Sequence, residues 1–233
     1  MRRVTVLLAL VLAGSGCASK QADPVPAAAT AVSYHGLEPA PVPPRPSYVL
    51  QDTSGRRYDF TRETGKRPTL VYFGYTHCPD ECPTAMADVA AALRKVPADL
   101  RSQVRVIFVT TDAKRDTGPV LRRWLDQFSP SFIGLLGTQA QVDAAARASG
   151  VSPGQVGPPI VALPGHPDQH VHQPGTAPHQ HFGPLGYSVS HSAVIYAYDA
   201  SDRLPVVYPG GVTPSDIAAD LPVLAKIRKI RPT

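Results

Sequence analysis

The stretch TLVYFGYTHCPDECPTAMADVAAALRKV, residues 69–96, changes its pattern of apolar side chains partway along. Its first eight residues form a mostly β-branched and aromatic run without polar alternation, which is typical of a strand buried on both faces. Residues 83–96 instead carry apolar side chains at helical spacing, behind a proline suited to a first helical turn. A second apolar run, VRVIFVTT, follows at 104–111. Strand, helix and strand in this order predict a right-handed parallel crossover.

The next part of the chain repeats this alternation. We expect a helix, a short strand and another helix at residues 119–128, 132–137 and 138–150. The last of these helices ends at Gly150, as helices commonly do at glycine. The pattern therefore predicts a second crossover of the same kind.

The C-terminal part predicts an antiparallel hairpin and a final helix. Two apolar runs, at 190–200 and 204–210, flank a turn-like segment at 201–203. A helix is expected after Thr213, with a kink at Pro222 because proline lacks the N–H that helix interiors need. Two crossovers, a hairpin and a terminal helix are the element order of a thioredoxin-like fold. The predicted class is α/β, with a central mixed sheet flanked by helices.

The N-terminus has the pattern of a leader that is removed. Residues 1–16, MRRVTVLLALVLAGSG, place two arginines before an apolar run that is too short to span a bilayer. The small residues before Cys17 resemble a bacterial lipoprotein box, in which this cysteine is lipidated after cleavage. The alternative is an ordinary secretory signal with an incidental cysteine. Both place the protein outside the cytoplasm, and lipidation of Cys17 would place it at the extracytoplasmic face of a bacterial cell membrane.

Two segments contain so much proline that no packed secondary structure is expected in them. Residues 17–47 are rich in alanine and proline and are expected to form a semi-extended spacer before a folded domain at 48–233. Residues 152–184 contain eight prolines, five glycines and five histidines, and are expected to be an insertion without a packed element. Its histidines could capture Cu(II), since imidazole suits that ion. The alternative is a loop that has drifted in composition.

The charge of the chain points to no polyanionic partner. The net charge is +5, and two of the positive charges lie in the leader. This balance gives no support to nucleic-acid binding. The segment KIRKIR at 226–231 clusters four positive charges, for which a solvated helix end is the expected explanation.

Cys78 and Cys82 lie at the predicted start of the helix that follows the first strand. Unpaired N–H groups and the positive dipole end of a helix favour thiolate over thiol there. The pair could therefore bind a metal, exchange electrons or form a disulfide, although a disulfide across so short a loop adds little stability. Two thiolates suit Cu(I), whereas zinc would normally need four protein ligands, which this chain without a second cysteine pair does not supply.

One histidine is placed to complete a copper site. His191 directly precedes the run SAVIYAY at 192–198, and the start of that strand can face the N-terminus of the cysteine-bearing helix. Thioredoxin-like oxidoreductases carry a cis-proline at the corresponding place, and this chain has none there. His77 adjoins Cys78 but is expected to point away from the pair, and His35 lies in the spacer and is expected to be solvated.

Three stretches resemble the SCO/SenC family of copper-binding proteins. GYTHCPDECPT at 74–84 resembles the family's copper-binding signature. VTTDAKRDTGPVLRRWLDQFSPSFIGL at 109–135 and GYSVSHSAVIYAYD at 186–199 resemble two further family segments. The resemblance implies a thioredoxin-like protein held at the outer face of a membrane. It also implies one Cu(I) or Cu(II) ion bound by Cys78, Cys82 and His191, and a role in assembling the binuclear copper centre of cytochrome c oxidase subunit II.

The chain departs from the family pattern at two positions. Ser190 stands where the family often has aspartate, and Ala113 where it often has proline. Loss of that acid is expected to change the orientation of the neighbouring histidine, which tunes metal affinity more than ligand identity. Asp112 and Asp116 match family positions. We expect them to support local structure at a strand end and a helix start, with an acidic docking surface as the alternative.

Two functions stay open from the sequence, with a copper or redox sensor as a third that no feature favours. The first is a copper-binding assembly factor acting on subunit II or a similar cuproprotein, supplied by a copper donor and a thiol reductant. The second is a thiol-disulfide reductase, in which Cys78 attacks a partner's disulfide and Cys82 resolves the mixed disulfide. Three residues between the cysteines and a histidine in place of the proline favour metal binding, so enzymatic activity is uncertain.

Overall fold

A computed structural model describes residues 33–159 and 187–226. The predicted leader, the predicted lipidation site Cys17 and the five histidines of the insertion lie outside the described residues. Within the described part, no helix combines the length and the apolar character that crossing a bilayer requires.

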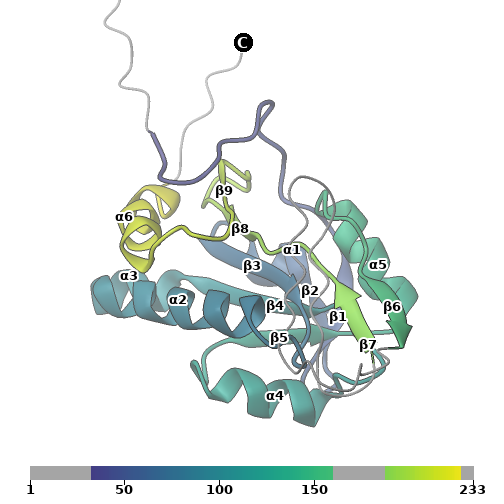
Figure 1. Cartoon of the computed structure of the whole chain (residues 1–233). Coiled ribbons are helices and arrows are strands. Elements are labelled where there is room, and N and C mark those ends of the chain that lie inside the picture. Colours follow the sequence, from purple (N-terminus) through teal and green to yellow (C-terminus); the bar gives the residue numbers. More distant parts are fainter. Residues whose placement is uncertain (1–32, 160–186, 227–233) are drawn as a thin grey trace, which may run out of the picture. The chain divides into compact units, whose positions relative to one another are not determined.

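The core of the fold is a seven-stranded mixed sheet in the order β2-β1-β5-β4-β3-β8-β9 (Figure 1). The three middle strands β3, β4 and β5 run parallel, and all other neighbours pair antiparallel. The strands are β1 Val49–Asp52, β2 Arg57–Asp59, β3 Thr69–Gly74, β4 Arg105–Thr110, β5 Ile133–Leu136, β8 Ile195–Tyr198 and β9 Val206–Tyr208. The mixed sheet of the predicted fold class is therefore confirmed.

Helices cover both faces of this sheet. They are α1 Phe60–Thr64, α2 Glu81–Lys95, α3 Ala98–Gln103, α4 Gly118–Asp126, α5 Gln139–Ala148 and α6 Pro214–Leu224. Figure 1 shows α2 and α6 side by side on one face. Trp124 of α4 packs on Phe108, whose ring stacks with that of Tyr72. On the other face, Val71 and Phe73 join a buried cluster with Val142 of α5.

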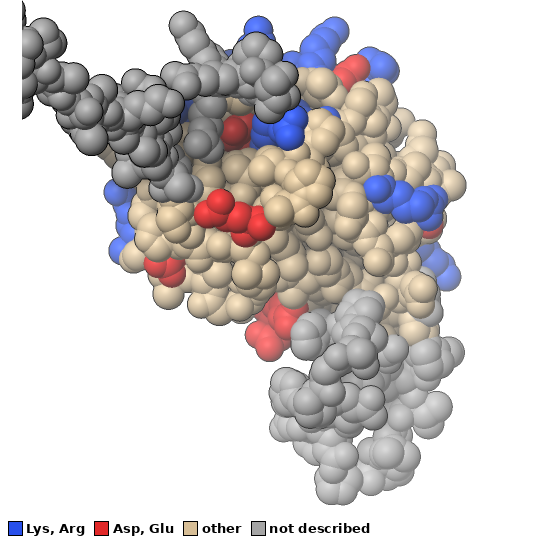
Figure 2. Space-filling view, turned by 90° about the horizontal axis from the view of Figure 1, so that it is seen from above, with Lys and Arg blue, Asp and Glu red and all other residues tan. Residues whose placement is uncertain are grey.

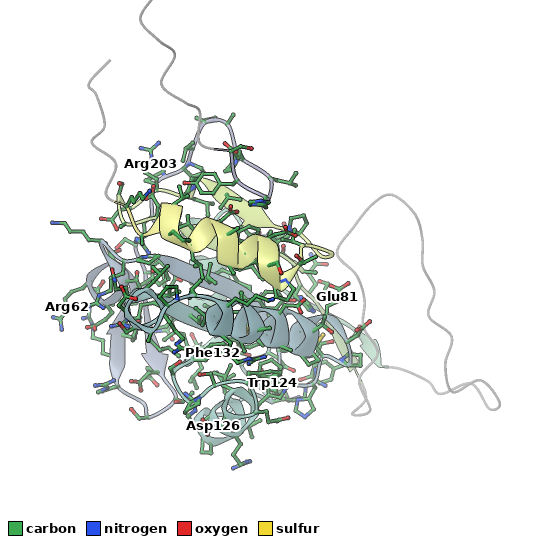
Figure 3. All side chains as sticks on the ribbon, turned by 90° about the vertical axis from the view of Figure 1, so that its left-hand side faces the viewer. Arg62, Glu81, Trp124, Asp126, Phe132 and Arg203 are labelled. Carbon is green, nitrogen blue, oxygen red and sulfur yellow. The ribbon has the colours of Figure 1, made fainter. Side chains whose placement is uncertain are left out.

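Every residue of β3 is buried, as the unbroken apolar run predicted. Residues pointing to opposite faces of the strand pack under different helices, which leaves no polar face. In Figure 3 the buried Phe132 lies in the interior of the domain, whereas Arg62, Asp126 and Arg203 lie at its surface. The C-terminal end of β3 is therefore buried, and the loop that follows it starts from the core.

The strand predicted at 190–200 is confirmed only over β8, and Ser190 instead ends a different strand that belongs to another sheet. β7, Tyr187–Ser190, pairs with β6, Gln155–Pro159, in a separate two-stranded sheet, and β8 begins only at Ile195. The prediction that the insertion holds no packed element was therefore wrong for its first residues. Pairing with a distant strand supplies the hydrogen bonds that a proline-rich segment cannot make locally.

The packed part of the chain begins earlier than the sequence predicted. Residues 34–47, here called the strap, lie on the domain although they were expected to be spacer. Leu37 and Val207 exchange two backbone hydrogen bonds of 2.9 Å. The buried Arg45 guanidinium donates to Asp202 Oδ1 at 2.8 Å. The strap could not be predicted from composition, because backbone hydrogen bonds and a buried arginine hold it on the domain and few large apolar residues are needed.

The charged side chains visible in Figure 2 form separate small groups of either sign on a mostly uncharged face. Long-range attraction of a polyanion needs a continuous patch of one sign. The face shown there presents no such patch.

Candidate metal centre

The cysteine loop joins the buried end of β3 to the start of α2. Cys78 lies in this loop, and Cys82 lies in the first turn of the helix. The backbone N–H of Cys82 donates to Cys78 Sγ at 3.4 Å. The N–H groups in the first turn of a helix have no partner within the helix, and one of them here donates a hydrogen bond to the sulfur of Cys78.

The structure brings His191 to this pair. Its Nε2 atom lies 3.5 Å from the sulfur of Cys78 and 3.5 Å from that of Cys82. One ligand atom from each of the three residues fits within a mutual distance of 4.8 Å. Among the described residues, no other group of His, Cys, Asp and Glu side chains brings three ligand atoms this close. Two sulfurs and one imidazole are a soft donor set that suits copper.

The three side chains are withdrawn from solvent, with exposed fractions of 5% for Cys78, 0% for Cys82 and 2% for His191. The rings of Tyr72 and Tyr75 lie edge-on to the imidazole, with centroids 6.1 and 5.5 Å from it. These rings fix the plane of the imidazole and exclude water. The site is therefore shaped before any ion arrives.

The two thiols differ strongly in acidity. Hydrogen bonding with Cys82 has the largest effect on Cys78 and, together with the hydrogen bond and charge of His191, lowers its pKa to about 4, although burial opposes this shift. Burial, together with the neighbouring Cys78, raises the pKa of Cys82. Near neutral pH the pair thus holds one thiolate and one thiol, and the thiolate is a nucleophile and a ready metal ligand.

Gly74, the last residue of β3, is required by the close approach of Cys82. A Cβ atom at this position would lie 2.7 Å from Cys82 Sγ and 2.7 Å from the Tyr72 ring. Only glycine leaves room for the sulfur at this point.

Asp116 fixes the loop that carries Cys78. This fully buried carboxylate accepts hydrogen bonds from the Thr76 backbone N–H at 3.0 Å and the Thr76 hydroxyl at 2.7 Å. It also accepts from the Thr110 hydroxyl at 2.6 Å. The sequence predicted a local role at a helix start, but Thr117 occupies that position and Asp116 instead bonds a residue forty positions earlier. Burial raises the pKa of this carboxyl.

A second cluster ties the strand before His191 to the same region. The Tyr187 hydroxyl donates to Asp112 Oδ1 at 3.0 Å, and the Arg115 side chain donates to the same carboxylate. The Arg115 guanidinium lies 3.6 Å from the centroid of the Tyr187 ring and 5.6 Å from that of Tyr75. Sequence reasoning did not select Arg115 or Tyr187, because only the i, i+3 spacing of Asp112 and Arg115 hints at their pairing.

The other two described histidines take no part in the three-residue cluster. His77 Nδ1 lies 3.1 Å from the Thr76 hydroxyl and 3.7 Å from Asp116. The prediction that His35 is solvated is confirmed only in part. Its Nδ1 atom lies 2.7 Å from Asp220 Oδ1, although about half of its side chain remains exposed.

Comparison with known proteins places the chain in a family. A family model described as SCO1/SenC matches residues 40–162, which include both cysteines and end before His191. Protein SenC of Rhodobacter capsulatus is 46% identical over 103 residues, which make up 44% of this chain and 45% of SenC. The chain thus spans less than half the length of this curated relative.

Two solved structures resemble the chain over a larger part of it. The copper-bound structure of ScoI from Bradyrhizobium japonicum is 27% identical and covers 77% of this chain and 98% of its own, with a TM-score of 0.59. The solution structure of apo Sco1 from Thermus thermophilus is 28% identical and covers 84% and 99%, with a TM-score of 0.63. These matches confirm the thioredoxin-like fold. Since the family model covers more than half of its residues, the chain belongs to the SCO1/SenC family.

Proposed function

We propose that this protein binds one copper ion and delivers it for assembly of the binuclear copper centre of cytochrome c oxidase subunit II. The observation that carries the proposal is the convergence of Cys78, Cys82 and His191 on a single point in a buried, preformed site. Copper-bound ScoI, whose fold this chain shares, supports the choice of metal.

The acidity of the two thiols suggests how the ion is taken up and released. Cys78 is already a thiolate, whereas Cys82 gives up a proton when it binds copper, so binding becomes tighter as pH rises. Thiolates of the acceptor then replace the two cysteines one at a time. His191 holds the ion between these exchanges, and each incoming thiolate takes the place of one outgoing sulfur.

The proposal also includes a location outside the cytoplasm. Removal of the leader and lipidation of Cys17 would fix the protein to the extracytoplasmic face of a bacterial membrane, with the residues between Cys17 and the strap as a spacer. Mass spectrometry of the processed chain tests this. A Cys17→Ser variant should move from the membrane fraction to the soluble fraction, and unchanged fractionation would contradict the anchor.

The copper site is tested by titrating reduced residues 18–233, which include the whole compact unit from Tyr34, with Cu(I) under competition from a chelator. We expect one equivalent to bind. Cys78→Ala and His191→Ala should each weaken the affinity by at least about 100-fold, because each removes a direct ligand rather than a supporting contact. His35→Ala, which removes an imidazole away from the cluster, is the matched control. Equal affinities of the His191→Ala and His35→Ala proteins would refute the assignment of His191.

A second candidate, thiol-disulfide reduction, is favoured by the unequal acidity of the two thiols. The Cys78 thiolate would attack one sulfur of a partner's disulfide and release the other as a thiolate. Cys82 would then lose its proton and attack Cys78, which releases the reduced partner and leaves this chain oxidised by two electrons. Rapid reduction of a disulfide-bonded acceptor by the metal-free chain, with no tight copper binding, would favour this candidate over copper delivery.

A further inference from the structure

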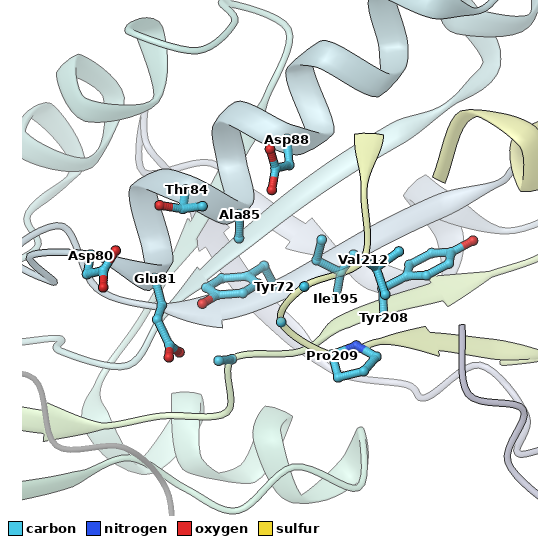
Figure 4. Close-up of a pocket in the computed structure, with 13 residues that line it drawn as sticks. Tyr72, Asp80, Glu81, Thr84, Ala85, Asp88, Ile195, Tyr208, Pro209 and Val212 are labelled. Carbon is cyan, nitrogen blue, oxygen red and sulfur yellow. The ribbon is translucent and has the colours of Figure 1, made fainter. Parts of the chain in front are cut away.

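A groove with a volume of about 320 Å³ lies between α2 and the C-terminal strands (Figure 4). One wall comes from the start of α2, and the other from β8 and from the turn that follows β9. It is lined by Tyr72, Asp80, Glu81, Thr84, Ala85, Asp88, Ala193, Ile195, Tyr208, Pro209, Gly210, Gly211 and Val212. The volume is at the lower end of the range for ligand pockets and can accept one or two side chains of a bound segment.

The helical wall is acidic. Glu81, Ala85 and Asp88 recur at positions i, i+4 and i+7 and so share one face of α2, and Asp80 precedes them. No lysine, arginine or histidine is among the described residues that line the groove. Partial burial raises the pKa of Asp88, which lies on the groove side of this helix. A cation in the groove would offset this effect of burial.

The floor and the opposite wall are mostly apolar. Tyr72 and Ile195 are buried side chains on the floor, and Figure 4 shows the Tyr72 ring between the two walls. Gly210 and Gly211 form part of the rim, where an added Cβ would meet no atom within 4 Å. The absence of side chains at these two positions leaves the groove accessible to an extended chain.

The groove adjoins the metal centre. Tyr72 lines it, and the same ring lies 6.1 Å from the imidazole of His191. Asp80 and Glu81 line it as well, and they immediately precede Cys82 in the chain. Because the two sulfurs are buried, an acceptor must be held against this region for ligand exchange to occur. A segment bound in the groove would provide that hold.

We propose that the groove between Asp88 and Gly210 docks a positively charged, extended segment of the copper acceptor, with an apolar side chain on Tyr72 and Ile195. The partner class follows from charge complementarity and from the apolar floor. The proposal rests on copper delivery as the function of the site. It adds the specificity that brings one acceptor to the cysteines.

The test uses the metal-free chain and a short fluorescent peptide of alternating lysine and leucine. We expect binding that weakens with salt, and no binding of the same peptide with glutamate in place of lysine. Ala85→Leu should block the groove and weaken binding by about tenfold, while Ala87→Leu, an exposed position on the same helix, should leave it unchanged. Asp88→Asn should weaken binding, and Asp99→Asn on α3 should not.

Several results would overturn the inference. One is equal peptide affinity for the Ala85→Leu and Ala87→Leu proteins, and another is equal binding of the acidic peptide. Self-association of the chain that Ala85→Leu abolishes would assign the groove to a second copy instead. Copper titration of each variant is a separate readout, so loss of peptide binding with intact copper binding leaves the proposed function standing. Intact peptide binding by a chain that binds no copper would remove that function alone.

Discussion

Asp116 and Thr76 are joined by two hydrogen bonds, one to the backbone N–H and one to the hydroxyl of the threonine. These bonds anchor the cysteine loop at a point two residues before Cys78. The same carboxylate binds Thr110 at the end of the neighbouring strand β4. Asp116, which is not one of the three clustered residues, therefore fixes the cysteine loop.

Replacing Asp116 by alanine is expected to destabilise both the fold and the copper site. Loss of a buried acceptor leaves the Thr76 N–H unsatisfied, which should lower the free energy of unfolding by about 3 kcal/mol. Urea denaturation and competitive copper titration measure the two effects. Asp126→Ala removes an exposed carboxylate from α4 and should change stability by less than about 1 kcal/mol. An Asp116→Ala protein that keeps wild-type copper affinity would show that the loop needs no such anchor.

Gly74→Ala is expected to disturb the site by crowding. The new methyl group would collide with Cys82 Sγ and the Tyr72 ring, and crowding of this kind costs about 1 to 3 kcal/mol. Copper affinity should fall with stability, because the sulfur must move. Gly210→Ala is the matched control, since nothing lies within 4 Å of the added atom. Equal melting temperatures of the two variants would contradict the packing argument.

The acidity of Cys78 predicts an unusual pH profile for its alkylation. With a pKa of about 4 it is a thiolate above that pH, so its reaction with iodoacetamide should change little between pH 6 and 8. The rate for an ordinary thiol rises steeply over this range. In a Cys82→Ala protein the pKa of Cys78 should rise, because the hydrogen bond that lowers it most is gone. Mass spectrometry of the alkylated protein measures both profiles, and a steep wild-type profile would argue against a preformed thiolate.

The strap should be held more firmly in acid than in base. The hydrogen bond and charge of Asp220 raise the pKa of His35 above its usual 6.5. The stabilisation by protonated His35 is therefore complete below pH 6.5 and is lost as the pH rises through the raised value. The stability difference between wild type and His35→Ala, from urea denaturation at several pH values, should shrink above neutrality. A stability difference that grows with pH would contradict the expected sign of this linkage.

Long, strongly patterned segments made much of the fold predictable. The apolar runs of β3 and β4 and the helical spacing of α2 fixed the first crossover, and the family resemblance was confirmed by the comparisons. The short elements β1, β2, α1 and α3 were missed because three to six residues carry too little periodicity. β6 was missed because its partner β7 lies beyond the insertion.

The three clustered side chains could be selected from sequence because two of them lie four residues apart at a strand-to-helix junction and the third directly precedes a recognisable apolar run. Their supports could not. Asp116 reaches Thr76 across forty residues, and Arg115 meets Tyr187 across seventy-two. Such pairings follow from the order of strands in the sheet, which local spacing does not reveal. The groove beside α2 could not be predicted for the same reason, because about half of its lining residues come from the C-terminal part of the chain.

The strap has a consequence for the solution behaviour of this protein. β9 is the last strand of the sheet, and the hydrogen bonds between Leu37 and Val207 occupy its outer side. An uncovered edge strand offers its backbone to other molecules and promotes aggregation. A fragment that begins at Tyr48 would expose this edge, whereas one that begins at or before Tyr34 keeps it capped. By covering the outer side of β9, the strap thus protects the domain against intermolecular strand pairing.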